Sequence, residues 1–322
     1  MKKVVLDEDS LSEEHMKEAV LRSGYLLEGR VAAALRKAAY KAITNRAFVD
    51  IEGNKSREYD VFSYKRITVY KGGSFEIYPT IICECKNNPR PIAFIVDEGA
   101  QFEPVIDEVM VSGIPAQIRS GAGFISVQEF LGARKSHHFC NPTTVVSPKC
   151  CTFELKKDKS AWMANHSDDL YETFRTLSKA LEFEINEDFD NMGQWFDAKE
   201  KQRTFMDLSF YYPLVVYQGE IFAAYISKDQ HDVRLEKRDH IQFNPEFFSF
   251  YENDVISYHF DVISESYLGR YLALIELEMD GFKKVLQSKK KTVVNSVKQI
   301  VQECRTLGKE SRSYRTYLQH EY

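Results

Sequence analysis

Cysteine is scarce in this sequence, and long apolar runs are missing. Six cysteines stand among 322 residues without regular spacing, which is typical of a chain kept in a reducing compartment and excludes a disulfide-stabilised class. The first residues run quickly into acidic side chains, so the apolar centre of a secretory signal is missing. No stretch approaches the roughly 20 apolar residues that a membrane-spanning helix needs. We therefore expect a cytoplasmic protein that does not enter a membrane.

Motifs for nucleotides and for zinc are also missing. The sequence contains no P-loop, and Gly121-Ala122-Gly123 lacks the third glycine of a dinucleotide-binding loop. Five potential zinc ligands occur in one region without the Cys-x-x-Cys pairs that make such a site recognisable, namely His137, His138, Cys140, Cys150 and Cys151. Zinc and an ATP-driven step within this chain are therefore not expected.

The net charge of −5 argues against a protein that coats nucleic acid nonspecifically, but the charge is unevenly distributed. Residues 283–322 carry +7, which leaves −12 on residues 1–282. A basic tail on an acidic body permits a localised contact with a polyanion, and a solvated lysine-rich helix is the alternative interpretation. The tail also has apolar residues at nearly heptad spacing (Val293, Val297, Ile300, Cys304 and Leu307), so it could dock on the body, or pair with a second copy or a partner subunit.

The chain alternates between helical and strand-like segments. Residues 12–41 predict one long helix, and strand-like segments follow, with a tight turn at Gly72-Gly73. Residues 97–145 predict an elaboration with short helices. Ser167 is a suitable N-cap for the amphipathic helix that follows it, and Gly219 is predicted to lie at the centre of a hairpin. Two further helices, the first starting near Leu268, end the chain. This order predicts one α/β domain over residues 1–282, with a mixed sheet flanked by helices, and a helical extension over 283–322.

Two of the predicted strands carry a pattern that indicates chemistry. Asp60 lies within REYDVF, and Glu84 and Lys86 lie within IICECKNN, at the end of an apolar strand. Side chains alternate along a strand, so Glu84 and Lys86 share one face while Cys85 points to the other. If the strand of Asp60 is the neighbour, the two carboxylates can converge on a hard cation such as Mg²⁺ or Mn²⁺.

This arrangement resembles the PD-(D/E)xK nuclease superfamily, whose fold is the restriction-endonuclease-like fold. The resemblance rests on Asp60, 23 intervening residues, and then Glu84-Cys85-Lys86, and it covers residues 20–96 closely. Many members also carry a glutamate on the preceding helix, where this sequence has Glu28 in GYLLEGRV. Tyr59 stands where the superfamily name has proline, a position at which its members vary.

The resemblance implies a metal-dependent nuclease. Asp60, Glu84 and the backbone carbonyl of Cys85 would bind Mg²⁺ or Mn²⁺, and Lys86 would orient or help to deprotonate the attacking water. Glu28 would bind a second ion or a coordinated water. The expected substrate is DNA, cut to leave a 5′-phosphate, in defence against foreign DNA or in DNA processing.

Two other interpretations of the same residues stay open. In one, Asp60 caps a turn, while Glu84 and Lys86 pair across a solvated strand face. In the other, the chain is a nucleic-acid-binding or assembly subunit with the same fold and an inactive site. The complete set of Asp60, Glu84, Lys86 and Glu28 favours the enzyme, because an inactive site would tend to have lost one of the four.

Overall fold

The structure is a computed structural model, and it describes residues 11–70, 74–97, 109–120, 123–140, 144–156, 160–166, 168–197 and 205–307. The predicted turn at Gly72-Gly73 and the predicted N-cap at Ser167 lie outside these residues. Within them, the chain is a mixed α/β protein, as the alternation of segments predicts. No helix in the described ranges combines the length and the apolar character that crossing a membrane would take.

The predicted helix over residues 12–41 is in fact two helices. Ser12 caps α1 (Glu13–Arg22), and its side chain accepts a hydrogen bond from the backbone N–H of His15. Ser23 then takes an extended conformation and Gly24 begins α2 (Tyr25–Lys37). At the far end Ala39 adopts a φ of 66°, a left-handed conformation that ends helices. The prediction of a single helix was therefore wrong at Ser23, where the local sequence has no proline to mark the break.

The other helices follow the predicted periodicity closely. Short helices occur in the 97–145 region, as expected, and the long amphipathic helices after residues 167 and 267 are both present. Their bounds are α3 (Val127–Leu131), α4 (Ala133–Ser136), α5 (Asp168–Asp197), α6 (Leu268–Ser288) and α7 (Lys290–Leu307), with 3-10 turns η2 (His138–Cys140) and η3 (Glu265–Tyr267).

Nine strands of the described chain form a central sheet, in the order β1-β2-β4-β12-β18-β15-β9, with β3 beside β4 and β6 beside β12. The strand β4 lies between an antiparallel neighbour, β2, and a parallel neighbour, β12. The bounds are β1 (Lys41–Asp50), β2 (Lys55–Tyr64), β3 (Ile67–Thr68), β4 (Ser74–Lys86), β6 (Val111–Ile114), β9 (Val146–Ser147), β12 (Phe205–Tyr217), β15 (His240–Phe243) and β18 (Phe260–Ser264).

A second sheet has the order β11-β10-β5-β13-β14. Its strands are β5 (Ile92–Asp97), β10 (Lys149–Leu155), β11 (Trp162–Asn165), β13 (Ile221–Ile226) and β14 (Val233–Arg238). Two small hairpin sheets complete the described structure, and they consist of β7 (Gln117–Ser120) with β8 (Gly123–Ser126) and β16 (Glu246–Ser249) with β17 (Asp254–Ser257).

Gly219 does not centre a hairpin, so that prediction was wrong. The strands on its two sides belong to different sheets, because β12 pairs with β4 while β13 pairs with β5. The chain thus passes from the central sheet to the second sheet twice, once from β4 to β5 and once from β12 to β13 at Gly219. The two passages run side by side, because β4 is parallel to β12 and β5 is parallel to β13. A Cβ atom at Gly219 would lie 2.4 Å from the carbonyl oxygen of Asn88, so only glycine fits this close crossing.

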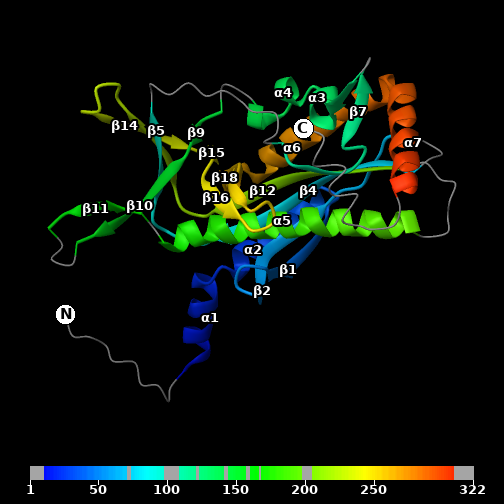
Figure 1. Ribbon diagram of the computed structural model, residues 1–322. Coiled ribbons are helices and arrows are strands. Elements are labelled where there is room, and N and C mark those ends of the chain that lie inside the picture. The colour runs from blue at the N-terminus through cyan, green and yellow to red at the C-terminus, as the bar shows by residue number, and fades with distance from the viewer. Residues whose placement is uncertain are drawn as a thin grey trace.

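Helices cover both faces of the central sheet (Figure 1). On one face, α2 and α6 pack on the apolar side chains that we call the first core, which includes Leu27, Val31, Cys83, Cys85 and Ile275. On the other face, α5 packs on the second core, which includes Tyr59, Ile82, Phe174, Leu177 and Val215. The strand β4 therefore contributes Phe75, Ile77, Ile81, Cys83 and Cys85 to the first core and Ile82 to the second, which fixes the direction of its side chains.

The described part of the tail, residues 283–307, is continuous with the body. No break occurs at Phe282, because α6 runs to Ser288. Val293 and Val297 of α7 are buried in the first core, so the beginning of the predicted apolar stripe docks on this chain. The burial of the stripe's remaining positions, Ile300, Cys304 and Leu307, lies outside the described side chains.

Candidate metal and catalytic site

The strands of Asp60 and Glu84 are neighbours, as the proposed site requires. They pair in antiparallel register, in which Val61 lies opposite Cys83. This register places Asp60 opposite Glu84, one residue beyond the last ladder pair. The two predicted acidic residues therefore lie at the same end of the same strand pair.

The direction of Asp60 depends on a distortion of its strand. Tyr59 packs in the second core and Val61 in the first, although residues two apart in a regular strand share one face. Opposite Asp60, Asn45 has a φ of 53° and makes no ladder pair with it, although the pairs on both sides are formed. The strand therefore turns at Asp60 and leaves its carboxylate at the rim of the sheet, where it accepts a 2.6 Å hydrogen bond from the backbone N–H of Cys85.

Glu84 and Lys86 share the face of β4 that is directed toward α5. Ile82, two residues earlier, packs in the second core, whereas Cys83 and Cys85 pack in the first. The Lys86 Nζ atom lies 3.2 Å from Glu84 Oε2, and the two side chains are 35% and 8% exposed. The carboxylate of Glu84 is thus almost enclosed, and the ammonium group of Lys86 is its neighbour nearer to solvent.

Glu28 reaches the same place from α2, where Leu27 and Val31 anchor the helix in the first core. A Cβ atom added to Gly24 would lie 3.3 Å from Glu28 Oε1 and 3.9 Å from the carbonyl oxygen of Cys85. The Glu28 carboxylate and the Cys85 carbonyl therefore both border Gly24. All five predicted groups converge on the end of β4.

The electrostatics of the site show an excess of negative charge. Burial, and after it the charge of Asp60, raises the pKa of Glu84 to about 7, although Lys86 opposes the shift. Burial also raises the pKa of Asp60, although the hydrogen bond from the N–H of Cys85 and the charge of Lys86 act to lower it. Burial and Asp60 likewise raise the pKa of Glu28. Three carboxylates share one lysine, so a divalent cation would relieve a real repulsion.

These donors fit a hard cation. Carboxylate and carbonyl oxygens are the ligands that Mg²⁺ and Mn²⁺ prefer, and Asp60, Glu84, Glu28 and the Cys85 carbonyl supply them around the end of β4. The three carboxylates do not bring three oxygens within 4.8 Å of one another in this structure, so binding of a cation would draw them closer together. The interpretation in which Glu84 merely pairs with Lys86 on a solvated face does not match the burial of Glu84, which is 6% exposed. The interpretation in which Asp60 caps a turn does not match its place inside β2.

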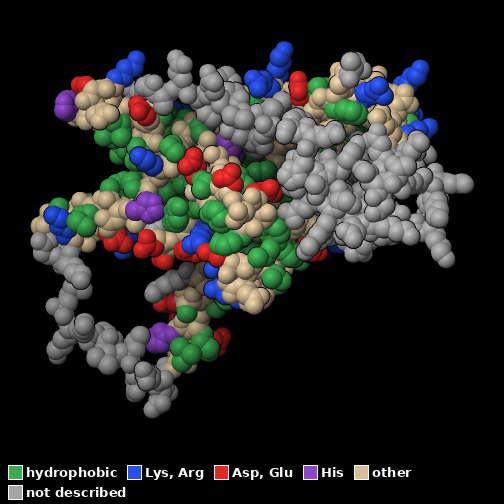
Figure 2. Space-filling view, in the orientation of Figure 1, with side chains coloured by type: hydrophobic (Ala, Val, Ile, Leu, Met, Phe, Trp, Pro, Cys, Tyr) green, Lys and Arg blue, Asp and Glu red, His purple; other side chains and the backbone are tan. Residues whose placement is uncertain are grey.

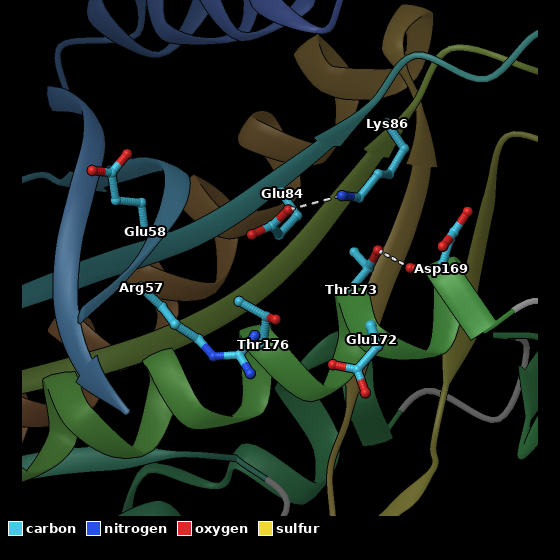
Figure 3. Close-up of a pocket in the computed structure, with 8 residues that line it drawn as sticks. All are labelled: Arg57, Glu58, Glu84, Lys86, Asp169, Glu172, Thr173 and Thr176. Atoms are coloured by element: carbon cyan, nitrogen blue, oxygen red, sulfur yellow. Dashed lines mark hydrogen bonds and ion pairs between the residues drawn. The ribbon is translucent and has the colours of Figure 1, made fainter. Parts of the chain in front are cut away.

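A groove of about 370 Å³ gives access to Glu84 and Lys86 (Figure 3). Its wall on the strand side consists of Arg57, Glu58, Glu84 and Lys86, and its wall on the α5 side consists of Asp169, Glu172, Thr173 and Thr176. Figure 3 shows the α5 side chains across the groove from Glu84. Neither Asp60 nor Glu28 belongs to this lining, so the groove exposes only the Glu84 and Lys86 side of the site.

The residues of the α5 wall were missed by sequence reasoning. Asp169, Glu172, Thr173 and Thr176 follow one another at i, i+3, i+4 and i+7, which is the spacing of one helical face. This polar face was a recognisable signal, but its position opposite β4 depends on long-range packing. In Figure 2, acidic side chains gather over the N-terminal part of α5, which agrees with the exposure of Asp169 and Glu172.

The five potential zinc ligands do not assemble. Cys140 lies in the first core and Cys150 in the second, on opposite faces of the central sheet. His137 and His138 instead meet carboxylates. In the described chain, the groups that bring three potential ligand atoms within 4.8 Å are His137, His138 and Glu278, and His138, His240 and Asp261.

Comparison of the chain with protein-family models, with curated proteins and with solved structures finds no match in any of the three.

Proposed function

We propose that this protein is a metal-dependent nuclease with a restriction-endonuclease-like core, and that it hydrolyses phosphodiester bonds in DNA. The support is the order and placement of four residues. A helix carries Glu28, the strand β2 carries Asp60, and the adjacent strand β4 ends in Glu84-Cys85-Lys86. This is the arrangement that the sequence resemblance implies.

The observation that carries the proposal is the burial of Glu84 among like charges. An enclosed carboxylate with a pKa of about 7 costs stability, and a protein gains nothing structural from Glu84 that an apolar residue would not give. Groups with such shifted pKa values gather at functional sites. A requirement for a cation at the end of β4 accounts for both the burial and the crowding.

In this proposal, Asp60, Glu84 and the Cys85 carbonyl hold Mg²⁺ or Mn²⁺, and Glu28 holds a second ion or a coordinated water. The cation supplies Lewis-acid activation of the phosphate and of the attacking water. Lys86 is paired with Glu84 in this structure, at 3.2 Å. With the charge of Glu84 compensated by a cation, the ammonium group of Lys86 would be able to orient the water and to offset the growing charge on the phosphate.

The test is to incubate purified protein with supercoiled plasmid, linear duplex, single-stranded DNA and RNA, in Mg²⁺, in Mn²⁺ and in a chelator. We expect cleavage of DNA that needs the cation and that leaves 5′-phosphate ends, detected by ligation of the products. The Asp60→Asn variant is the control for contaminating nucleases. Cleavage that persists in chelator, or equally in Asp60→Asn, would overturn the proposal.

A failure to cut any substrate, combined with salt-dependent binding of DNA, would favour the binding or assembly subunit instead.

A further inference from the structure

A buried cluster of histidines and carboxylates lies on the face of the central sheet opposite the groove. Its members come from separate parts of the fold. His138 lies in η2, Asp261 in β18 and Glu278 in α6, and none of the three is more than 4% exposed. Asp261 pairs in register with Leu214, whose side chain belongs to the first core, so the cluster is on the α6 side of the sheet. The proposed nuclease site uses none of these residues.

Both ring nitrogens of His138 face a carboxylate. Its Nδ1 atom lies 2.7 Å from Glu278 Oε1, and its Nε2 atom lies 2.8 Å from Asp261 Oδ2. An ionised carboxylate can only accept hydrogen bonds, whereas a neutral imidazole has one donor and one acceptor nitrogen. Either the ring carries protons on both nitrogens, or one of the two carboxyl groups is protonated.

The surroundings of the two carboxylates favour the charged ring. Asp261 also accepts from Tyr271 Oη at 2.6 Å and from His240 Nε2 at 2.7 Å. Glu278 also accepts from the backbone N–H of His138 at 2.7 Å and from Tyr212 Oη at 3.0 Å. The two tyrosine hydroxyls and the backbone N–H donate to the carboxylates, and His240 does so in the tautomer with a proton on Nε2. Such donors stabilise the ionised form of a carboxyl group.

We propose that His138 is a permanent imidazolium cation, and that its two ion pairs lock the segment at η2 onto the strand β18 and the helix α6. The lock joins η2, which comes directly after α4, to two elements that lie more than 120 residues later in the chain. The positive charge of His138 compensates two buried carboxylates at once, and a buried carboxylate without a compensating charge is among the costlier arrangements in a protein core.

A metal ion is the rival explanation, because two histidines and a carboxylate also suit Zn²⁺. The distances argue against it. Two ligands on a tetrahedral zinc, each about 2.0 to 2.1 Å from the metal, stand about 3.3 Å apart. The N–O distances of 2.7 and 2.8 Å at His138 are instead those of charge-assisted hydrogen bonds.

The adjacent histidine supports a single fixed charge. Burial acts to lower the pKa of His138, but Asp261 and Glu278 outweigh it and raise the pKa to about 10. Burial lowers the pKa of His137 to about 4, so this ring stays neutral while it stacks on His138 at 4.8 Å. The other titratable groups that face the cluster are His240 from β15, His259 beside β18, Tyr212 from β12, Tyr271 from α6 and Tyr40 ahead of β1.

The lock should fail only at the extremes of pH. Because the pKa of His138 is raised in the folded protein, its contribution to stability is complete below about 6.5 and disappears as the pH rises through about 10. Burial acts to raise the pKa values of Asp261 and Glu278, but the histidines outweigh it and lower both, so the contributions of the two carboxylates disappear only as the pH falls below the ordinary range of carboxyl groups.

The direct test is nuclear magnetic resonance of the full-length protein with ¹⁵N-labelled histidine. A pH of about 8.5 lies two units above the pKa of a free imidazole, so an unperturbed imidazole is neutral there. We expect at least one histidine that still carries protons on both ring nitrogens. A spectrum without such a ring at that pH would overturn the proposal, and so would stoichiometric zinc in the purified protein by mass spectrometry.

A variant adds a second readout. Glu278→Gln keeps the size of the side chain but removes one of the two charges that face His138. Thermal unfolding of this variant should occur about 5 to 10 °C lower at neutral pH, and the doubly protonated ring should lose a proton at a lower pH. The matched control is Glu187→Gln, an exposed position on α5. Identical ring titration in wild type and Glu278→Gln would refute the assignment.

Discussion

The backbone N–H of Cys85 donates a 2.6 Å hydrogen bond to Asp60 Oδ2. This contact joins the two strands of the site beyond the last ladder pair, and it leaves Oδ1 of the same carboxylate available. The N–H and C=O groups of one residue in an extended strand point to the same side. The carbonyl of Cys85 is therefore directed toward the side of Asp60 and Glu28, as a ligand to the same cation would have to be.

Lys86→Ala should abolish cleavage and leave the fold intact. The side chain is 35% exposed and contacts Glu84, so its loss removes no core packing. Loss of a positive charge at the reacting phosphate typically costs about two to four orders of magnitude in rate. Single-turnover cleavage measures the effect, with Lys55→Ala, an exposed lysine at the start of β2, as the control. A wild-type rate in a folded Lys86→Ala protein contradicts the proposed role.

Asp60→Asn should change stability in opposite directions with and without the cation. Without a cation, it removes one of three crowded carboxylates and should leave the unfolding temperature unchanged or raise it. With Mn²⁺, the wild type should gain stability according to the ligand concentration, and the variant should gain little. Thermal unfolding at several Mn²⁺ concentrations gives both numbers, with Asp229→Asn in an exposed loop as the control. Equal stabilisation of wild type and Asp60→Asn places the cation elsewhere.

The alternation of β4 was readable from the sequence, and the distant contacts were not. Glu84, Lys86 and Cys85 take the faces that period two predicts, because both faces of β4 are buried and the register cannot slip. The bend at Asp60 depends on Asn45 in the neighbouring strand, which no local pattern shows. The prediction of a hairpin at Gly219 was wrong for a related reason. A glycine between two apolar segments does not reveal which other strands those segments will pair with.

The stability of the cation-free protein should fall as the pH rises from about 4.5 to about 7. The folded protein holds the proton of Glu84 more tightly than the unfolded chain does, because its pKa rises from 4.5 to about 7. The loss should reach about 3 kcal/mol at most. Glu84→Gln should flatten this dependence, as measured by denaturant unfolding across that pH range. Binding of Mn²⁺ to the wild type near pH 6 should also release a proton, seen by calorimetry in buffers of different ionisation enthalpy.

Glu28→Gln should reduce the rate while it retains part of the affinity for Mn²⁺. Glu28 lies beside the Cys85 carbonyl but comes from a helix, and it is only half-buried. Its expected partner is a second ion or a coordinated water, so the first ion should still bind. Comparing the Mn²⁺ dependence of the rate in wild type and variant tests this. Loss of all cation binding in Glu28→Gln would instead make Glu28 a ligand to the first ion.

Replacing the lysines of the tail should weaken DNA binding and its salt dependence. Deleting the tail after Phe282 is not a usable test, because Leu286, Val293 and Val297 are fully buried. Substitution of Lys284, Lys289, Lys290 and Lys291 by Gln keeps that packing, and all four are exposed.

The slope of log affinity against log salt should flatten by about two to four units, at roughly 0.9 for each phosphate contact. A control protein with Gln at Lys135, Lys149, Lys156 and Lys228, which are also exposed, should keep the wild-type slope. An unaltered slope in the tail variant would show that these lysines do not contact DNA, and would support the alternative interpretation of a solvated lysine-rich helix.

The position of β4 between β2 and β12 has a consequence for motion. All thirteen residues of β4 pair with β12. One face of β4 packs in the first core, and Ile82 on its other face packs in the second. The amide hydrogens of β4 should therefore exchange with solvent among the slowest in the molecule, at the free energy of global unfolding. Asp60 and Glu28 lie on more adjustable elements, a bent strand and a helix whose first turn follows the break at Ser23. Any closing of the site around a phosphate would then move Asp60 and Glu28 toward a stationary Glu84 and Lys86.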